Sequence, residues 1–409
     1  MSSVSSPKPV LLVLASTYPR WTDDPEPGFV HELSRRLCSD FRVIVLCPHA
    51  AGAKPTETMD GVEVIRYRYA PERLQTLVNN GGIVTNLRND RWKLLLVPGF
   101  VLMQAWQAWR LCQQHRIASI HAHWLIPQGL IAAMLQRLPG SRPTFVVTSH
   151  GADLYALRGG PLQALKRTVL RRAHSATVVS TAMRTAIGQL GGDTDKVSVV
   201  PMGVDMANRF VPGNAAQRSR NELLFVGRLV EKKGLRYLLD ALPALLRAQP
   251  DLHLTIAGFG PDEAQLKHRV MELDLQQSVR FLGAVAQKDL PQLYQSAALF
   301  VAPFVRAESG DQEGLPVALM EAVACGCPAV AGNVEGLQDI FGPHAQECMV
   351  DPRDSGALTA AILGRLQAPE TAGKQALAMR AALLERLGWE HVAARYSQLL
   401  KQAGLPLDH

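Results

Sequence analysis

Short apolar runs alternate with longer amphipathic segments along almost the whole chain. In the first half the apolar runs predict strands at Val10–Leu14, Arg42–Cys47, Val62–Tyr67, Ser119–Ala122, Thr144–Thr148, Ala176–Val179 and Val197–Val200. The segments between them predict helices at Val30–Leu37, Leu94–Gln114, Gly129–Leu138, Leu162–Arg172 and Ala182–Leu190. Strands that alternate with helices are typical of a parallel sheet covered by helices, so this half predicts one doubly wound α/β domain.

A second series of the same kind follows. Gly, Pro and Asn break the alternation over residues 203–221, which predicts a linker between domains at 1–202 and 222–409. In the second domain, strands are predicted at Leu223–Val226, Leu252–Ala257, Val279–Leu282, Leu299–Ala302 and Ala329–Ala331, and only helices are predicted from Ser355 to Gly404. Two tandem Rossmann-like domains would face each other across a cleft at the carboxyl ends of their strands, where we expect the functional site.

Charge is distributed unevenly between the two halves. The net charge is +7, but residues 1–210 hold 24 Lys and Arg against 14 Asp and Glu, whereas the remainder holds 19 against 22. The basic first half indicates an anionic partner, either a membrane surface or a nucleic acid. Charge that only keeps the protein in solution is the alternative.

The remaining composition narrows the class of protein. The six cysteines contain no Cys-x-x-Cys pair, so we expect reduced thiols and neither a disulfide framework nor a zinc ribbon. No apolar segment precedes the first predicted strand, and the longest uncharged run, Leu94–Trp109, falls short of the ~20 residues that span a bilayer. We therefore expect a cytoplasmic protein without a transmembrane helix.

Two carboxylates flank the start of a predicted helix, Gly314–Cys325. Glu313 precedes the helix and Glu321 lies two turns inside it, so both could face one ligand. A helix start offers backbone N–H groups to a phosphate, and a carboxylate accepts hydrogen bonds from the vicinal hydroxyls of a ribose or a sugar. The spacing alone is a weak indication, because it also arises by chance on many solvated helices.

A cluster of basic residues follows the first strand of the second domain, where an α/β sheet presents a loop to its ligand. Arg228 and Lys233 in this loop could neutralise a diphosphate leaving group, a task that a divalent metal would otherwise perform. A solvated charge run is the alternative, and we expect Lys232 to be part of such a run.

Histidines mark the corresponding edge of the first domain. His150 follows the strand Thr144–Thr148, where it could hydrogen-bond a substrate hydroxyl, although a histidine satisfied within a turn is the alternative. We expect only one of His121 and His123 to face the cleft, and no metal site there. The run Asp193–Asp195 looks like a metal-nucleotide motif, but its position predicts a turn with local caps.

Several motifs occur in a fixed order along the chain. They are Pro27-Gly28-Phe29, His121-Ala122-His123, Ser149-His150-Gly151-Ala152-Asp153, Val200-Pro201-Met202-Gly203-Val204-Asp205, Gly227-Arg228 with Lys233-Gly234, Gly258-Phe259-Gly260, and Glu313 with Glu321. From about Val10 to about Tyr396 this order resembles glycosyltransferase family 4, the retaining, nucleotide-sugar-dependent enzymes of the GT-B fold. The chain departs from the family pattern at Glu335 and Asp339, where relatives commonly have Gly and Glu.

The resemblance implies a role for each matching residue. Arg228 and Lys233 would hold the diphosphate, and Glu321 would accept hydrogen bonds from the ribose. Glu313 and His150 would contact the donor sugar, and the final helix would return to the first domain. The donor site would comprise Gly28, Arg228, Lys233, Glu313, Gly314, Leu315, Pro316 and Glu321, with His150, Arg228, Lys233 and Glu313 as the catalytic set.

The resemblance also implies a reaction. A hexose would move with retention from a nucleoside diphosphate sugar, UDP- ahead of GDP-, to a hydroxyl of a glycan or a polyprenyl-diphosphate-linked glycan in cell-surface polysaccharide synthesis. The leaving phosphate would help to deprotonate the acceptor, and no metal or other cofactor is expected. A sugar phosphorylase or nucleotide-sugar epimerase of the same fold is the alternative. A nicotinamide oxidoreductase would need a Gly-x-Gly-x-x-Gly after the first strand, and the sequence has none there. A nucleic-acid-binding module would need a recognition helix or aromatic platforms, and neither is apparent. Both classes are therefore disfavoured.

Two segments of the basic half predict peripheral attachment to an anionic membrane. The helix Leu162–Arg172 has Leu162, Leu165 and Val169 on one side and Lys166, Arg167, Arg171 and Arg172 on the other, and Arg91–Arg110 adds Trp92, Trp106 and Trp109. Several basic residues near an anionic surface, at about 1 kcal/mol each, would give reversible binding. The alternative is a solvated helix face and tryptophans in the core.

Overall fold

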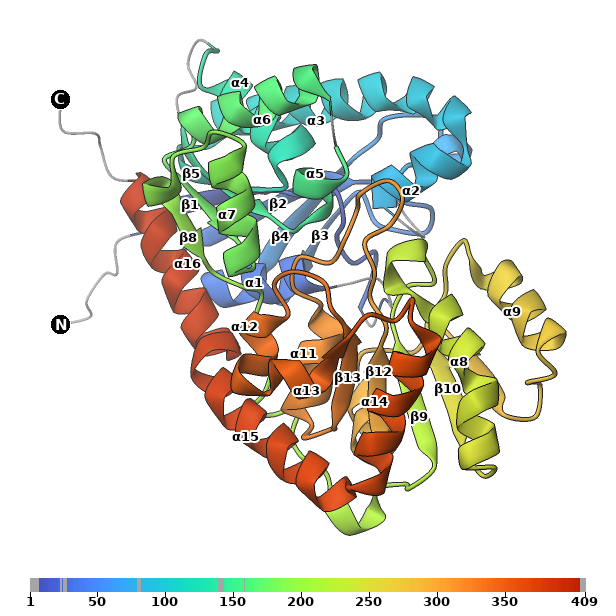
Figure 1. Ribbon diagram of the computed structural model, residues 1–409. Helices are drawn as coiled ribbons and strands as arrows, with labels where there is room; N and C mark the ends of the chain where they lie inside the picture. The colour runs from blue at the N-terminus through green and yellow to red at the C-terminus, as the bar shows by residue number, and fades with distance from the viewer. Residues whose placement is uncertain are drawn as a thin grey trace. The chain divides into compact units, whose positions relative to one another are not determined.

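The computed structural model describes residues 7–22, 24, 28–78, 82–138, 143–157 and 159–404. The chain divides into two compact units (Figure 1). Unit 1 comprises Met1–Pro201 and Val392–His409, and unit 2 comprises Met202–His391. Each unit is built on a sheet of mostly parallel strands with helices between them, as the sequence pattern predicts.

Unit 1 contains an eight-stranded sheet with the order β3-β4-β2-β1-β5-β6-β7-β8. The strands are β1 (Val10–Leu14), β2 (Arg42–Pro48), β3 (Thr56–Met59), β4 (Val62–Tyr67), β5 (Ile117–His123), β6 (Thr144–Ser149), β7 (Ser175–Val178) and β8 (Val197–Val199). Only the edge strand β3 runs antiparallel to its neighbour, and its polar sequence gave no apolar signal. The strand order reverses between β1 and β5, which is where such sheets bind ligands.

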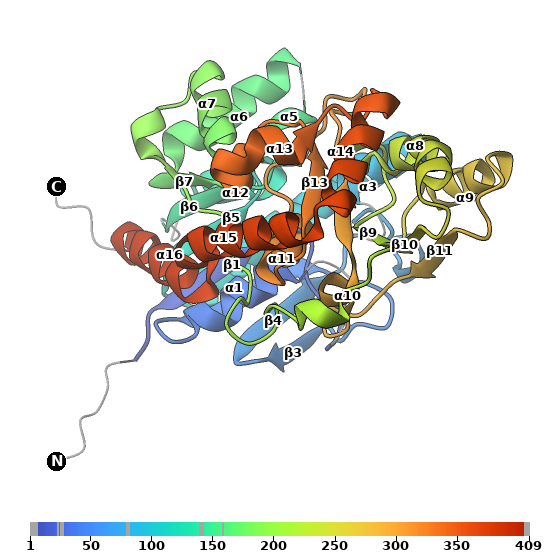
Figure 2. The ribbon, with the colours of Figure 1, turned by 60° about the horizontal axis from the view of Figure 1, so that its bottom comes forward.

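The helices of unit 1 cover both faces of this sheet. They are α1 (Phe29–Leu37), α2 (Gly82–Asn89), α3 (Leu96–Gln114), α4 (Leu130–Leu135), α5 (Ala152–Tyr155), α6 (Gly160–Arg172), α7 (Thr181–Gln189) and the last helix α16 (Trp389–Gly404). Figures 1 and 2 both show α1 and α16 on one side of the strands and α6 and α7 on the other.

The last helix is tied to unit 1 by its polar groups. Tyr396 is fully buried and donates its phenolic hydrogen to the carbonyl of Val200 at 3.1 Å. Ser397 and Lys401 both donate to the carboxylate of Asp40, at 2.7 and 2.6 Å. This is the element that the family resemblance places on the first domain.

Unit 2 contains a six-stranded parallel sheet with the order β11-β10-β9-β12-β13-β14. The strands are β9 (Glu222–Val226), β10 (His253–Ala257), β11 (Val279–Gly283), β12 (Leu299–Ala302), β13 (Ala329–Gly332) and β14 (Met349–Val350). The helices are α8 (Leu235–Ala248), α9 (Glu263–Glu272), α10 (Leu290–Ser296), α11 (Val317–Ala324), α12 (Gln338–Phe341), α13 (Ala345–Cys348), α14 (Ser355–Gln367) and α15 (Pro369–Leu387). Here the strand order reverses between β9 and β12.

The central strand of unit 2 is buried on both faces. Leu223 and Phe225 of β9 pack into one hydrophobic core, and the alternate residues Leu224 and Val226 pack into a second core on the other face. Successive side chains of a strand point to opposite faces, so four consecutive apolar residues serve both cores. This explains why β9 is a continuous apolar run in the sequence.

The segment expected as a linker, 203–221, is part of unit 2. Val204, Met206 and Phe210 are buried in the same core as α11, and the N–H of Val204 donates to the carbonyl of Leu387 at 2.8 Å. The guanidinium of Arg380 also donates to the carbonyl of Met206. The Gly and Pro residues of segment 203–221 produce irregular backbone, but its apolar side chains pack into the core of unit 2. The prediction of a linker between the two domains is therefore wrong.

No helix in the described ranges is long and apolar enough to cross a bilayer.

A left-handed glycine ends the loop that follows β9. Gly234 has a φ of 68°, and a Cβ atom placed on it would lie 1.7 Å from the carbonyl oxygen of Pro303, which follows β12. We expect Gly234→Ala to reduce the free energy of unfolding by about 3 kcal/mol or more, since it combines backbone strain with a clash against backbone. Equilibrium unfolding in urea measures this change.

Gly283 provides the matched control for this substitution. Its φ is 69°, but no atom lies within 4 Å of the added Cβ. Gly283→Ala should therefore cost only the strain of the left-handed backbone, about 1–2 kcal/mol. Equal losses in the two variants would contradict a close approach of the two loops at Gly234.

Candidate functional site

Three loops of unit 2 meet at the carboxyl ends of β9, β10 and β12. The N–H of Gly227 after β9 donates to the carbonyl of Ala257, and the N–H of Leu229 donates to the carbonyl of Phe259 in the next loop. A Cβ on Gly258 would lie 1.9 Å from the carbonyl oxygen of Gly227, so only glycine allows this approach. The loops of β9 and β10 therefore form one rigid edge at the reversal of strand order.

The third loop, which follows β12, places one carboxylate against two lysines of the loop that follows β9. Lys232 Nζ lies 3.4 Å from Glu313 Oε1, and Lys233 Nζ lies 3.3 Å from Glu313 Oε2. Lys232 also contacts Asp311 Oδ2 at 3.2 Å. The carboxylate side chain of Glu313 is only 11% exposed, so water screens this network weakly. Each oxygen of Glu313 thus has its own cation.

The network shifts the pKa of each member. Burial alone would raise the pKa of Glu313, but the charges of Lys232 and Lys233 outweigh it and lower the pKa to about 2. Burial also acts against the charge of Lys232, but the charges of Glu313 and Asp311 raise its pKa. For Lys233, burial and the nearby charges of Lys232 and Arg228 lower the pKa in spite of Glu313. Lys233 is therefore a cation that an additional anion would stabilise.

Lys232 does not belong to a solvated charge run, so that expectation is wrong. It follows Glu231 in a short 3-10 turn, Glu231–Lys233, which directs both lysines toward Glu313. Sequence spacing gave no sign of this, because Asp311 and Glu313 are far away along the chain. Arg228 is half-buried in the same loop, near enough for its charge to act on Lys233.

Glu321 lies deeper, in the helix that follows Glu313. The helix α11 begins at Val317, after Pro316, and not at Gly314 as expected. Glu321 is only 4% exposed and accepts a hydrogen bond from the hydroxyl of Tyr294 at 3.0 Å. Burial raises its pKa to about 7, although hydrogen bonds from Tyr294 and Gln287 oppose this shift. The carboxyl group of Glu321 thus changes its protonation state near neutral pH.

The remaining expected donor-site residues of unit 2 lie between these two carboxylates in the chain. Gly314 and Pro316 are buried and Leu315 is half-buried. Leu315 packs against the same core as α11. Pro316 caps the helix with an extended backbone, and its carbonyl accepts the N–H of Leu319. The structure therefore fixes the short connection between Glu313 and Glu321.

Unit 1 gathers three histidines at the ends of β5 and β6. His121 and His123 lie on the same side of β5, with ring centroids 4.2 Å apart. The expectation that only one could face the ligand side is wrong, since residues two apart on a strand share a face. The Nδ1 of His123 is 2.9 Å from the Nε2 of His150, with the two rings nearly parallel. Phe29 contacts the ring of His150 from α1.

Burial keeps these histidines neutral. It lowers the pKa of His150 and of His121 to about 3, and the pKa of His123 well below its usual value. Asp153 holds the loop after His150 in place, because its carboxylate accepts the N–H of Leu125 at 2.7 Å and the hydroxyl of Ser149 at 2.9 Å. His150 can therefore exchange hydrogen bonds with a hydroxyl group without carrying a charge.

The first loop of unit 1 is only partly described. Gly28 directly precedes α1, and a Cβ on it would make an ordinary contact with Pro19 at 3.8 Å. Residues 23 and 25–27, including Pro27 of the family motif, lie outside the described residues. The role of Gly28 at a diphosphate stays a prediction.

The basic residues of α6 do not form one exposed face. Lys166 is buried, and its ammonium donates to the carbonyls of Leu154 and Leu157. Arg172 is half-buried and donates to the carbonyl of Ala133, and Arg167 donates to the carbonyl of Leu190. Lys166 therefore caps backbone carbonyls of the preceding segment, and the predicted membrane face of Lys166, Arg167, Arg171 and Arg172 is wrong for Lys166.

No cluster of three or more His, Cys, Asp or Glu side chains in the described ranges could hold a metal ion. The run Asp193–Asp195 forms a turn in which the Asp193 carboxylate accepts the N–H of Asp195, as expected.

Comparison with known proteins identifies the family. Residues 29–203 match the family described as Glycosyl transferase 4-like domain, and residues 208–380 match Glycosyl transferases group 1. A GDP-mannose-dependent alpha-(1-6)-phosphatidylinositol monomannoside mannosyltransferase of Mycolicibacterium smegmatis is 30% identical over 71% of the chain and 78% of its own length. The chain therefore belongs to the group 1 glycosyltransferases, with a glycosyltransferase 4-like domain in its first half. The enzyme is also 29% identical to a glycogen synthase of Mycobacterium tuberculosis, over 90% of the chain and 89% of the relative.

Solved structures share the fold. Sucrose-phosphate synthase of Thermosynechococcus elongatus superposes with a TM-score of 0.77 at 20% identity, covering 97% of this chain and 99% of that one. Anabaena HepE in complex with UDP and glucose gives a TM-score of 0.71 at 16% identity, covering 96% and 99%. The expected GT-B class of two parallel α/β domains is thereby confirmed.

Sequence reasoning missed the residues that support the site. Asp311 contacts Lys232 and Tyr294 donates to Glu321, but both lie in other segments and belong to none of the motifs. His123 and Asp153 belong to motifs, but their contacts with His150 and Ser149 were not expected. Only the strand order could have indicated these contacts. Once it is known that β9 and β12 are neighbours, the loops that follow them must lie side by side.

The double lysine contact makes a prediction about stability. Lys232→Met would leave Asp311 without its ammonium and Glu313 with one cation instead of two. We expect a loss of about 1–3 kcal/mol in the free energy of unfolding, because these carboxylates are poorly solvated. Lys267→Met, which breaks an exposed pair with Glu263 at 2.7 Å, should cost less than about 0.5 kcal/mol. Similar losses in both variants would contradict a weakly screened network.

Proposed function

We propose that this glycosyltransferase binds a nucleoside diphosphate sugar on unit 2 and transfers the sugar, with retention, to a hydroxyl of a glycan or lipid-linked glycan. The observation that supports this most strongly is the pair of cations in the loop after β9, Arg228 and Lys233. The side chain of Lys233 is only 13% exposed, its pKa is lowered, and it would gain most from a second anion. A leaving diphosphate is an anion of this kind.

We assign the donor contacts as follows. Arg228 and Lys233 bind the diphosphate and stabilise the charge that develops as the glycosidic bond breaks. Lys232 keeps Glu313 in place when Lys233 turns to the phosphate, so that Glu313 accepts hydrogen bonds from the sugar hydroxyls. Glu321 accepts the ribose hydroxyls, and neutral His150 contacts the sugar. Gly28 lets the first loop approach the diphosphate, whose oxygen accepts the acceptor's proton as the sugar moves.

The donor base and the acceptor follow less directly from the residues. We propose a UDP-sugar as the first donor to test and GDP-mannose as the second, since the mycobacterial relative is named for it. Other relatives are named for biosynthesis of amylovoran and colanic acid, which favours polysaccharide synthesis. We place this synthesis at the cell surface, with the enzyme on the cytoplasmic side of the membrane. The reaction needs no metal in this proposal, because side chains supply the cations.

The same-fold alternatives differ in their products. A sugar phosphorylase would consume inorganic phosphate, and an epimerase would change the donor without an acceptor. Product analysis with and without phosphate and acceptor separates them from a transferase.

Removing either proposed diphosphate cation tests the assignment. We expect Arg228→Ala and Lys233→Ala each to lower kcat/KM by about 10²-fold, since each cation stabilises charge in a partly dry site. The exposed Lys374→Ala is the control and should retain full activity. Steady-state kinetics in EDTA measures both effects, because the proposal assigns no role to a metal. Full activity of either variant, or loss of wild-type activity in EDTA, would contradict the proposal.

The carboxyl group of Glu321 predicts a pH dependence of donor binding. Hydroxyl groups donate to the ionised form, so binding should tighten as pH rises through about 7, the pKa set by burial. We expect the Kd for UDP-glucose or GDP-mannose to fall about tenfold from pH 6 to pH 8 in calorimetry. Glu321→Gln should bind more weakly with a flat profile. A flat wild-type profile would remove Glu321 from this role.

A further inference from the structure

Helix α3 of unit 1 has two different faces. Phe100, Gln104, Ala108 and Leu111 recur every three or four residues and are buried toward the sheet. Gln104 is fully buried and donates to the carbonyls of Ala15 and Leu46 at the ends of β1 and β2. This inward face fixes which residues of the helix point outward.

The outward face of α3 is apolar where a helix of a soluble domain is normally polar. Leu95, just before the helix, is 81% exposed, Leu102 is 65% exposed and Trp106 is 48% exposed. These residues follow one another at spacings of seven and four, so they form one stripe along the helix. Pro98, also exposed, lies in the same stripe.

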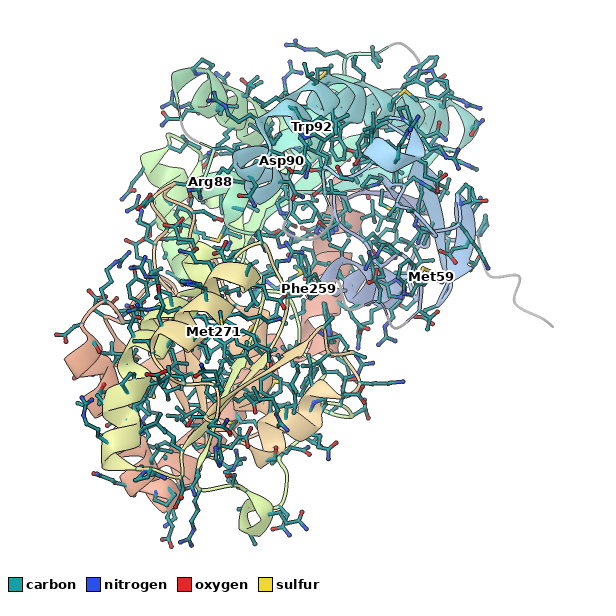
Figure 3. The ribbon with its side chains drawn as sticks, turned by 90° about the vertical axis from the view of Figure 1, so that its right-hand side faces the viewer. Met59, Arg88, Asp90, Trp92, Phe259 and Met271 are labelled. Atoms are coloured by element: carbon teal, nitrogen blue, oxygen red, sulfur yellow. The ribbon has the colours of Figure 1, made fainter. Side chains whose placement is uncertain are left out.

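Further apolar side chains are exposed near this stripe. Trp92 and Leu94, in the short helix η2 (Arg91–Leu95) that leads into α3, are 48% and 52% exposed. Figure 3 shows Trp92 beside Asp90 and Arg88, where the chain passes from α2 into η2. On α4, which packs against α3, Met134 is also 48% exposed. Eight of the fourteen large apolar side chains exposed in the described ranges lie at residues 92–165.

The charges around the stripe are mostly positive. Residues 91–192 contain twelve Lys and Arg and a single acidic residue, Asp153. Asp153 is buried and satisfied by hydrogen bonds within unit 1, so it does not offset these charges at the surface. Arg91, Arg110, Arg116 and Arg137 are all exposed. One exposed carboxylate, Asp90, lies beside Trp92 and pairs with Lys93 at 2.9 Å. The surface therefore combines exposed Leu and Trp with an excess of cations.

Arg110 and Trp106 are arranged as at a lipid–water boundary. The guanidinium of Arg110 lies 4.9 Å from the centre of the Trp106 ring. Trp and Arg pairs of this kind suit the headgroup layer, where the indole meets acyl chains and the cation meets phosphate.

We propose that this α3 surface, made of Arg91, Leu95, Leu102, Trp106 and Arg110, docks on a bilayer that contains anionic lipid. The apolar stripe inserts among the headgroups, and the surrounding arginines bind lipid phosphates. A second copy of the chain is a poorer occupant, because a two-fold contact would bring the same arginines against each other. This inference rests on the proposed function in one respect: docking on the bilayer would place the enzyme at a lipid-linked acceptor.

Binding to vesicles tests the surface without any assay of activity. Full-length protein should co-sediment with phosphatidylcholine vesicles that contain phosphatidylglycerol, bind pure phosphatidylcholine far more weakly, and dissociate as salt rises. Leu102→Glu and Trp106→Glu place a carboxylate in the stripe. Each should weaken vesicle binding by about tenfold or more, because anionic headgroups repel the carboxylate and its removal from water with the apolar stripe is unfavourable.

Met271→Glu is the matched control. Met271, labelled in Figure 3, is 54% exposed on α9 and belongs to unit 2, whereas the α3 surface belongs to unit 1, so its variant should bind vesicles like the wild type. Equal binding by Leu102→Glu and wild type, or no wild-type binding to anionic vesicles at low salt, would overturn the proposal. A dimer in solution that Leu102→Glu dissociates would also overturn it in favour of a second copy.

A parallel measurement keeps this result separate from the proposed function. Thermal stabilisation by a nucleoside diphosphate sugar should be the same in wild type, Leu102→Glu and Met271→Glu, with about 2.7 kcal/mol expected at 100 times Kd. Vesicle binding without any effect of nucleotide sugar would leave the membrane surface in place and contradict the proposed donor. Stabilisation by a nucleotide sugar without vesicle binding would support the proposed donor and overturn the proposed membrane surface.

Discussion

The site of unit 2 depends on one interaction, the contact of two consecutive lysines with the two oxygens of a single carboxylate. Lys232 and Lys233 each lie about 3.4 Å or closer to an oxygen of Glu313. Together they keep this buried acid ionised, with a pKa of about 2, while burial and the neighbouring cations leave Lys233 with a lowered pKa. An excess of positive charge beside an ionised carboxylate suits a ligand that carries both phosphate and hydroxyl groups. A nucleoside diphosphate sugar has both.

The fold makes this contact possible by placing two distant loops side by side. Residues of the loops after β9 and β12 are separated by some eighty positions in the chain, but these strands are neighbours at the reversal of strand order. Left-handed Gly234 lets the backbone of the first loop approach Pro303 of the other. The parallel sheet thus supplies a rigid edge, and short side chains and glycines let the charged groups converge there.

The sequence predicted the architecture well and the site only in part. Alternation of apolar runs and helical segments located nearly every strand, but it missed the polar edge strand β3 and the two-residue edge strand β14, and it treated residues 203–221 as a linker. The order of motifs along the chain carried the family resemblance, and that resemblance assigned Arg228, Lys233 and Glu313 to the donor site. It could not show that Lys232 turns inward, that Lys166 caps buried carbonyls, or that His123 contacts His150, because each depends on a partner from a different element.

The central claim is that a diphosphate replaces Glu313 as the partner of Lys233 while Lys232 retains the carboxylate. A crystal structure of the enzyme with UDP or GDP tests it most directly. We expect diphosphate oxygens within hydrogen-bond distance of Lys233 Nζ and the Arg228 guanidinium, the ribose on Glu321, and an intact contact between Lys232 and Glu313. A nucleotide bound elsewhere, or a diphosphate that leaves Lys233 paired with Glu313, would show that Lys233 does not exchange Glu313 for the diphosphate.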